Sequence, residues 1–303
     1  MTTKSKPNKA DALFERITDQ IINAIEAGAE DWKMPWQAIA TAGTPVSIDA
    51  RPYRGMNALW LAMESAANGY DSGVWGTYNA WKAHGAQVRK GEKSTPVFLW
   101  KPITKRDRDE SGEEEIRSFW IVRTYNVFAA EQVDGADDLI AKRKGADLNS
   151  DERIAEAERF VEVWGQEVTI NQKGSMAFYD RMLDRITVPA FESFRSAPDF
   201  YSTVAHESVH STGHGKRLDR NFGKRFGDEA YAMEELVAEL GAAFWCGANG
   251  ISQVPRYDHA AYLSHWLKVL RADPKALQTV ASKAQAAVDL LTETVAAAPA
   301  VAA

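Results

Sequence analysis

The segment His206-Glu207-Ser208-Val209-His210 has the residue types and spacing of a divalent-metal site. On a helix, positions four apart lie on the same side, so His206 and His210 can bind one ion while Glu207 faces a water on that ion. The preceding residues 201–205 are apolar enough for a buried helix, where these side chains without a ligand would be left unsatisfied. The pattern predicts a centre of the zinc-metallopeptidase type.

A third ligand must come from elsewhere, because a catalytic zinc ion keeps three protein ligands and an open position for water. The helix predicted over residues 230–245 offers Glu234, Glu235 and Glu239. Glu235 and Glu239 share a face because they are four residues apart. We expect Glu235 to bind the metal and Glu239 to orient a histidine through the ring N–H that the metal does not use. The alternative is a solvated acidic face, which is favoured most for Glu234.

Such a centre would perform hydrolysis. A metal of this kind lowers the pKa of its bound water to about 7, and Glu207 can then take the proton before the hydroxide attacks a carbonyl. The resulting oxyanion needs a donor, and the candidates, each with a purely structural role as its alternative, are Tyr231, His259, Tyr262 and His265. His214 continues the spacing of four, but Gly213 is expected to end the helix first, which places His214 at the surface or on the substrate side.

The ligand types also limit the choice of metal. Two imidazoles and one carboxylate are typical of Zn²⁺, which is the cofactor we expect. The same set accepts Mn²⁺, cobalt or nickel. A nuclease is disfavoured, because metal sites that cleave phosphodiesters use mainly oxygen ligands.

A second group of residues is basic and aromatic. Residues 51–106 contain nine lysines and arginines against three acidic residues, although the whole chain has a formal net charge of −6. Aromatic rings that stack on bases beside cations that bind phosphates are typical of single-strand binding. The alternative is that the tryptophans are core residues and the lysines are solvated. On physical grounds we select as DNA contacts Arg51, Tyr53, Arg54, Trp75, Tyr78, Trp81, Lys82, Arg89, Lys90 and Lys93.

The hydrophobic pattern predicts the elements that position both groups. Helical periodicity covers residues 11–28, 57–69 and 78–85, and strands are predicted at 95–100 and 119–128 with a charged, mobile loop over 105–117. After residue 150, helices are predicted to begin near 151, 201, 230 and 259, with short strands at 167–170, 176–179 and 186–188. This order indicates the α+β class.

Length and composition predict two domains with separate cores. The expected division is a flexible N-terminus (1–9), a single-stranded-DNA-binding domain (10–130), a linker (131–150), a metallopeptidase-like domain (151–290) and a disordered, alanine-rich tail (291–303). The one cysteine, Cys246, excludes an intramolecular disulfide and favours a reducing compartment. Without a signal-peptide pattern or an apolar run long enough for a membrane span, we expect a cytoplasmic protein with no membrane partner.

Several blocks, in one order, carry a resemblance to a known family: YRGMNALWL (53–61), WGTYNAWKAHGAQVRKGEKSTPV (75–97), HESVH (206–210), RLDR (217–220) and YAMEELVAELGAAF (231–244). Over about residues 10–270 the chain resembles the ArdC antirestriction proteins. The resemblance implies a single-stranded-DNA-binding domain joined to a zincin-like metallopeptidase domain, carried on conjugative plasmids and acting against host restriction of incoming DNA. Carried over by position, the ligands are His206, His210 and Glu235, with Glu207 catalytic.

Three functional hypotheses follow. The first is an antirestriction factor that binds single-stranded DNA and has a metallopeptidase fold. The second is an intracellular protease whose basic domain recruits a protein substrate, such as a component of the host restriction system. The third is a DNA-binding module that a metal stabilises without turnover.

Overall fold

The computed structural model describes the backbone of residues 9–26, 36–108, 114–140, 150–221, 229–251 and 260–299. Within these ranges the side chains of residues 41–42, 105–108, 114–117, 150–153 and 260–263 are not described. The predicted N-terminal segment before residue 9, the helix end at Gly28, the second half of the predicted linker (141–149), His259 and the side chain of Tyr262 therefore lie outside the described residues.

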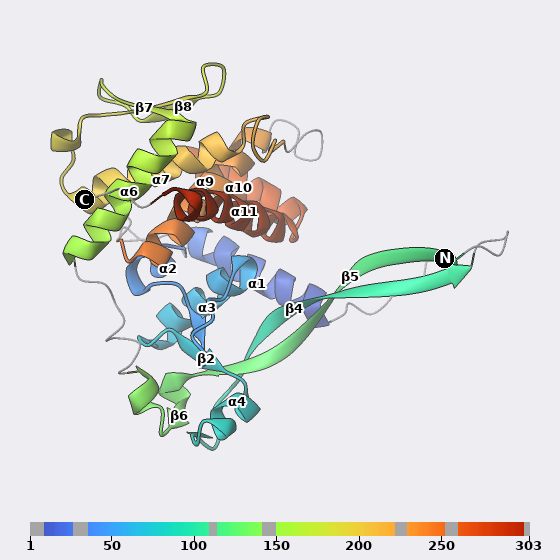
Figure 1. Ribbon diagram of the computed structural model, residues 1–303. Helices are drawn as coiled ribbons and strands as arrows, with labels where there is room; N and C mark the ends of the chain where they lie inside the picture. The colour runs from blue at the N-terminus through green and yellow to red at the C-terminus, as the bar shows by residue number, and fades with distance from the viewer. Residues whose placement is uncertain are drawn as a thin grey trace.

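Helices and strands are mixed along the chain, which confirms the predicted α+β class (Figure 1). The helices are α1 (Lys9–Glu26), α2 (Gln37–Ala42), α3 (Gly55–Asn68), α4 (Tyr78–Ala83), α6 (Ser150–Glu167), α7 (Ala197–Thr212), α9 (Ala230–Asn249), α10 (Ala260–Ala272) and α11 (Ala276–Ala297). The strands are β1 (Val46–Ser47), β2 (Val74–Gly76), β3 (Gln87–Val88), β4 (Thr95–Arg108), β5 (Glu114–Ala129), β6 (Val133–Asp134), β7 (Thr169–Gln172), β8 (Phe178–Asp180) and β9 (Arg185–Val188). None of the described helices is both long enough and apolar enough to span a membrane.

The strands form three small sheets rather than one large one. The first has the order β1-β2-β5-β4, with β1 and β2 parallel and the other neighbours antiparallel. The second pairs β3 with β6. The third has the order β7-β9-β8, with β9 parallel to β7 and antiparallel to β8. It lies beside α7 at the far end of the molecule from α4 (Figure 1).

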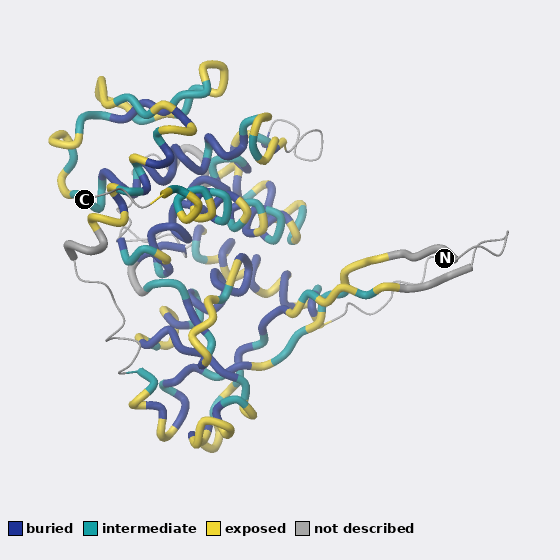
Figure 2. Tube along the Cα trace, viewed as in Figure 1, coloured by how far each residue is buried: buried dark blue, intermediate teal, exposed yellow. Residues whose placement is uncertain are grey.

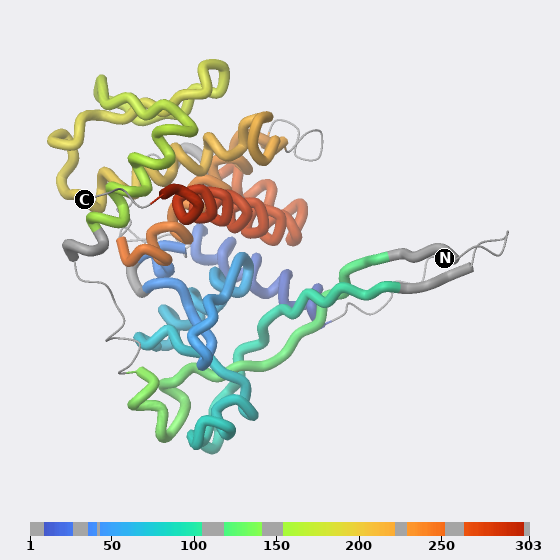
Figure 3. The backbone as a smooth tube through the Cα atoms, in the orientation of Figure 1, coloured from blue at the N-terminus to red at the C-terminus, as the bar shows by residue number. Residues whose placement is uncertain are grey.

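Strands β4 and β5 form a long two-stranded ribbon that projects from the body (Figures 1 and 3). The two predicted strands, 95–100 and 119–128, are confirmed. The prediction of a loop is wrong for residues 105–108 and 114–117, because the register continues from Thr95 opposite Val127 to Arg108 opposite Glu114. The rest of that predicted loop lies outside the described residues. Backbone hydrogen bonds extend a hairpin without any apolar side chains, and an absence of apolar residues is therefore poor evidence for a loop.

One hydrophobic core joins the two halves of the sequence, and the prediction of two separate cores is wrong. Leu59 and Trp60 of α3 belong to the same buried cluster as Leu277 and Val280 of α11. Figure 2 shows this buried layer running through the helices of both halves. Hydrogen bonds also cross between the halves, among them those from Gly55 N to Gln285 Oε1 (2.9 Å) and from Thr18 Oγ1 to the carbonyl of Pro274 (2.9 Å). A smaller cluster lies under α4, β3 and β6.

Helix α11 corrects the predicted C-terminal boundary. The disordered tail was expected from residue 291, but the helix continues to Ala297 and Leu291 is fully buried. The alanines that suggested disorder are small residues that allow close helix packing, since Ala281, Ala284 and Ala287 are also fully buried. Arg159 donates to the carbonyls of Val295 (3.2 Å) and Ala298 (3.1 Å) and so satisfies acceptors at the end of the helix.

Helices α7 and α9 pack closely at one point. A Cβ atom on Gly241 of α9 would lie 2.9 Å from each methyl carbon of Val209 of α7. Real side chains do not approach so closely, so only glycine allows this crossing. Val209 lies between His206 and His210, and the crossing therefore sets how near the histidines come to the glutamates of α9.

We predict that Gly241→Ala destabilises the protein by about 1–3 kcal/mol through overpacking, despite the higher helix propensity of alanine. Urea unfolding followed by circular dichroism measures the change. Gly165→Ala in α6 is the matched control, because its added methyl would lie no closer than 4.0 Å to a neighbour and is expected to be neutral or stabilising. Equal stability of Gly241→Ala and wild type would contradict the close crossing.

Candidate metal centre

Helix α7 carries the predicted metal-binding segment, and its ends are well defined. The Ser196 side chain accepts a hydrogen bond from Asp199 N (3.3 Å) at the start, and Pro198 stands in the first turn, where its missing N–H costs nothing. Gly213 ends the helix as predicted, with its N–H donating to the carbonyl of His210 (2.9 Å).

The side chains of His206, His210 and Glu235 converge. The two Nε2 atoms of the histidines are 3.2 Å apart. Glu235 places Oε2 3.7 Å from Nε2 of His206 and Oε1 3.5 Å from Nε2 of His210. Four donors at about 2.0–2.1 Å from a tetrahedral ion are separated by about 3.4 Å, so these three ligands have the spacing that zinc needs. Glu207, beside His206, is buried.

Each histidine is also contacted by a carboxylate on its other ring nitrogen. Nδ1 of His206 lies 3.1 Å from Oε1 of Glu239, and Nδ1 of His210 lies 3.3 Å from Oε1 of Glu234. Such contacts leave Nε2 free for a metal and fix the ring orientation. The solvated position favoured for Glu234 from the sequence is wrong, because that side chain belongs to the centre.

Arg220 holds Glu234 in place, and sequence reasoning did not assign it this role. The buried guanidinium forms two bonds with Glu234, from Nη2 to Oε1 (2.5 Å) and from Nε to Oε2 (2.8 Å). It also donates to the carbonyl of Val209 (2.7 Å) and to Oγ1 of Thr212 (2.8 Å) at the end of α7. A Cβ atom on Gly213 would lie 2.9 Å from Arg220 Nη2, which explains the glycine. The RLDR block that follows HESVH was the available signal.

The charges of the centre favour a cation. Burial opposes protonation of His210, but Glu234, Glu235 and the charge of Glu207 outweigh it and raise the pKa of His210 to about 10. Burial alone would raise the pKa of Glu235, yet its hydrogen bonds to His206 and His210 hold that pKa below the usual range. The carboxylates therefore remain charged around the imidazoles, and a divalent ion would take the place of a proton there.

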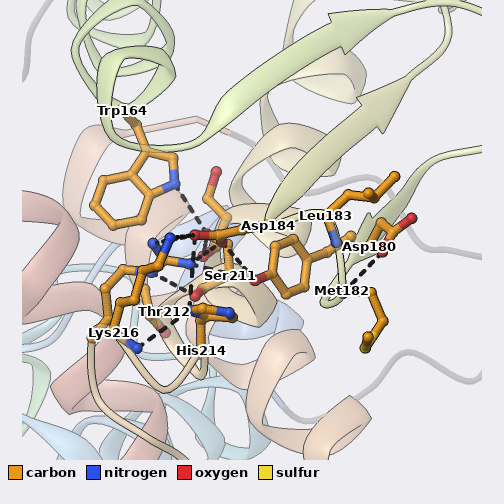
Figure 4. Close-up of polar contacts among 12 residues, drawn as sticks. Trp164, Asp180, Met182, Leu183, Asp184, Ser211, Thr212, His214 and Lys216 are labelled. Carbon is orange, nitrogen blue, oxygen red and sulfur yellow. Dashed lines mark hydrogen bonds and ion pairs between the residues drawn. The ribbon is translucent and has the colours of Figure 1, made fainter.

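His214 belongs to a polar cluster around Asp184 in the segment after α7 (Figure 4). The Nδ1 atom of His214 lies 3.8 Å from Oδ2 of Asp184, and Tyr179 donates to Oδ1 of Asp184 (2.7 Å). Arg217 pairs with Asp184 and donates from Nε to the carbonyl of Ser211 (2.8 Å). This cluster ties the β8–β9 turn to the segment after α7, and the surface or substrate-side role of His214 remains a prediction.

The predicted oxyanion donors remain predictions. Tyr231 is 62% exposed at the start of α9, one turn before Glu235. His265 is exposed on α10, with Nδ1 3.5 Å from Oγ of Ser264. The structure therefore leaves both rings accessible from solvent.

Two of the selected DNA-contacting residues are core residues. Trp75 and Trp81 are fully buried, and Nε1 of Trp81 donates to the carbonyl of Phe128 (3.1 Å). The prediction that they stack on bases is wrong, because neither ring presents a face to solvent. Tyr53 is partly buried beside Tyr125. Burial is the main cause that raises the pKa of Tyr53, and the neighbouring Tyr125 raises it further.

Apart from Tyr78, the remaining residues selected as DNA contacts are cations, some of which have an ion-pair partner. Arg54 forms an ion pair with Asp289 of α11. Nη2 of Arg89 lies 3.3 Å from Oε1 of Glu92, and Nη1 of Arg89 lies 3.5 Å from Oδ1 of Asp134. Both arginines therefore have structural partners. The selected cations that are exposed and have no ion pair in the described part of the chain are Arg51, Lys82, Lys90 and Lys93.

Tyr78 is 46% exposed and lines an open hollow of about 490 Å³ beside α4. The hollow is also lined by Gln87, Arg89, Lys90 and Phe128. Gln87 Nε2 donates to the hydroxyl of Tyr78 (3.2 Å), so the ring is held at the rim rather than left free.

Comparison with known proteins defines the class and then the family. The profile of zincin-like metallopeptidases matches residues 155–283, the part that contains all three candidate ligands. The profile of the N-terminal domain of anti-restriction factor ArdC matches residues 11–128. The chain belongs to the ArdC antirestriction family, and the resemblance found in the sequence is confirmed.

Full-length relatives support this assignment. The metal-free crystal structure of the antirestriction ArdC protein from plasmid R388 is 36% identical, with a TM-score of 0.75, and the match covers 95% of this chain and 99% of that one. Its Mn(II)-bound structure is 33% identical, with a TM-score of 0.72 and the same coverage of both chains. The uncharacterised protein y4eC of Sinorhizobium fredii is 42% identical over 297 residues, which are 95% of this chain and 94% of that protein.

A longer relative contains a similar segment. DNA primase TraC of Escherichia coli is 34% identical over 288 residues. The match covers 90% of this chain but only 19% of the primase. The similarity therefore concerns one segment of that protein.

We predict that Zn²⁺ or Mn²⁺ raises the melting temperature and that EDTA reverses the rise. At a free metal concentration 100 times the Kd, the stabilisation is expected to be about 2.7 kcal/mol. Differential scanning calorimetry measures it, with Glu235→Gln expected to lose the shift and Glu192→Gln, an exposed glutamate, expected to keep it. No shift in wild type would exclude a metal centre here.

Replacing Glu234 by glutamine should weaken metal binding about 10- to 100-fold while the three ligands remain, because His210 loses its charged partner. Titration calorimetry with Zn²⁺ gives the affinity. Glu167→Gln changes an exposed glutamate at the end of α6 and serves as the control. Wild-type affinity in Glu234→Gln would show that the outer carboxylate does not support the site.

Proposed function

We propose that this protein binds single-stranded DNA and protects incoming DNA from host restriction, and that its C-terminal half contains a metal-dependent, peptidase-type site. The observation that carries the proposal is the convergence of His206, His210 and Glu235 beside Glu207, in a chain whose other half matches the ArdC N-terminal domain. The proposed setting is the cytoplasm, and the proposed protein substrate is a component of the restriction system.

The chain's own residues fit this chemistry. A divalent ion, when bound, supplies a polarised water and an electrophile for a carbonyl. Glu207 is buried on the same helix as both histidines, which suits a proton acceptor. Glu234 and Glu239 orient the two imidazoles. Zinc is the proposed metal on the basis of its ligand preference, and manganese is supported by the Mn(II)-bound relative.

The proposed DNA-binding surface uses the exposed cations of the N-terminal half. Lys82, Lys90 and Lys93 have no ion pair among the described residues, and Tyr78 offers a ring in the hollow that Lys90 also lines. Cations that follow phosphates beside an aromatic ring favour single strands over duplexes. The overall charge of −6 does not oppose this, because the local balance decides binding.

A second candidate function is a DNA-binding module that the metal only stabilises. The burial of His206, Glu207 and Glu239 favours it, since a metal that pairs buried polar side chains contributes to folding stability whether or not turnover occurs. A bare protease with a recruiting domain gains no specific support from the geometry.

We predict that Lys82, Lys90 and Lys93 replaced together by glutamine abolish protection of incoming DNA in a transfer assay. The control replaces Lys173, Arg181 and Arg195, three exposed cations of the C-terminal half, and keeps protection at the same net charge. Full protection by the Lys82, Lys90 and Lys93 variant would contradict the proposal.

The variant Glu207→Ala separates the two candidates in the same assay. Loss of protection supports hydrolysis as the protective act. If protection is retained while EDTA still lowers the melting temperature, the stabilised module is the better description.

A further inference from the structure

The ribbon has an exposed aromatic stem that the sequence analysis did not select. We define the ribbon stem as residues 99–104 of β4 and 118–123 of β5, where the ribbon leaves the body. Leu99, Phe119 and Trp120 are 46%, 45% and 67% exposed. An exposed apolar patch, unlike a single exposed side chain, is typical of an interaction surface.

The register places this apolar surface beside cations. Leu99 lies opposite Arg123, Lys101 opposite Ile121 and Ile103 opposite Phe119, and directly opposite residues share one face. Lys101 and Arg123 are therefore diagonal neighbours on the face that also carries Phe119. Trp120, opposite Pro102, lies on the other face.

The charge of the stem has one sign. Lys101 and Arg123 are exposed, and residues 99–104 and 118–123 contain no acidic residue. Neither cation has an ion pair with a described carboxylate. The distal segment 105–117 contains six acidic residues against four basic ones, so the cationic stretch ends where the stem ends.

Strand β5 connects the stem with the hollow beside α4. Phe128 lines that hollow, and Trp120 lies eight residues earlier on the same strand, about 26 Å away at the usual rise of a strand. Figure 1 shows β5 running from the α4 end of the molecule out along the ribbon. Strand β5 therefore joins the stem to a hollow whose lining includes the exposed ring of Tyr78 and the cations Arg89 and Lys90, together with Glu92 and Asp134.

We propose that the ribbon stem is a binding arm for single-stranded nucleic acid, with Phe119 stacking on a base beside Lys101 and Arg123, which contact phosphates on that face, and Trp120 stacking on a further base from the opposite face of the ribbon. This inference rests on the proposed DNA-binding function and locates part of it. The alternative occupant is a second copy of the chain. A nucleic acid is favoured because the stem has unpaired positive charge and no acidic residue, whereas a copy would bring the same charges together.

Binding of a fluorescein-labelled oligothymidylate of about 16 nucleotides, measured by anisotropy across a salt series, tests the arm. Phe119→Ala and Trp120→Ala are each expected to raise the Kd at least about five-fold, as loss of one stacked base would. Lys101→Gln and Arg123→Gln should each reduce the slope of log affinity against log salt by about 0.7. Met182→Ala and Leu183→Ala, exposed apolar residues of the β8–β9 turn, are the controls and should bind as wild type does.

The outcomes separate the arm from the proposed function. If wild type binds and the Phe119→Ala/Trp120→Ala double variant binds equally well, the assignment of the ribbon stem as a binding arm is wrong, and the DNA-binding proposal stands. If wild type does not bind, both are wrong. Sedimentation velocity adds a third outcome: self-association that Trp120→Ala abolishes, with DNA binding unchanged, would assign the stem to a second copy and overturn the inference.

Discussion

The contact between Val209 and Gly241 fixes the distance between α7 and α9, and the candidate centre depends on that distance. Both histidines lie on α7 on either side of Val209, whereas Glu234, Glu235 and Glu239 lie on α9. A wider crossing would separate Glu235 from both imidazoles. Arg220 adds a second constraint, because it joins the end of α7 to Glu234 by hydrogen bonds to both. Backbone packing and one buried guanidinium therefore position the ligands.

The shared core gives the two halves a mechanical connection. Helix α11 packs against α9, which carries Glu235, and also against α3 of the N-terminal half. Arg54, at the start of α3, forms an ion pair with Asp289 of α11. The candidate metal centre and the N-terminal half therefore rest on one hydrophobic core.

Sequence reasoning succeeded where a short pattern has one geometric meaning. The spacing of His206 and His210 specifies a helix face, and Gly213 marks the end of that helix. Prediction from the sequence failed where tertiary packing decides whether a side chain is buried or exposed. In the sequence, Trp75 and Trp81 stand among basic residues, as an exposed aromatic residue that stacks on bases also would. Only the fold shows that both side chains are buried. The outer role of Glu234 depends on Arg220, 14 residues away, and no local pattern specifies that contact.

One divalent ion is proposed to bind between α7 and α9 through the side chains of His206, His210 and Glu235. Anomalous diffraction from crystals of the metal-loaded protein locates the ion without relying on activity. We expect one peak within about 2.3 Å of Nε2 of His206, Nε2 of His210 and a carboxylate oxygen of Glu235. An ion bound through Nδ1, or a peak near Glu234 and Glu239 with Glu235 turned away, would contradict it.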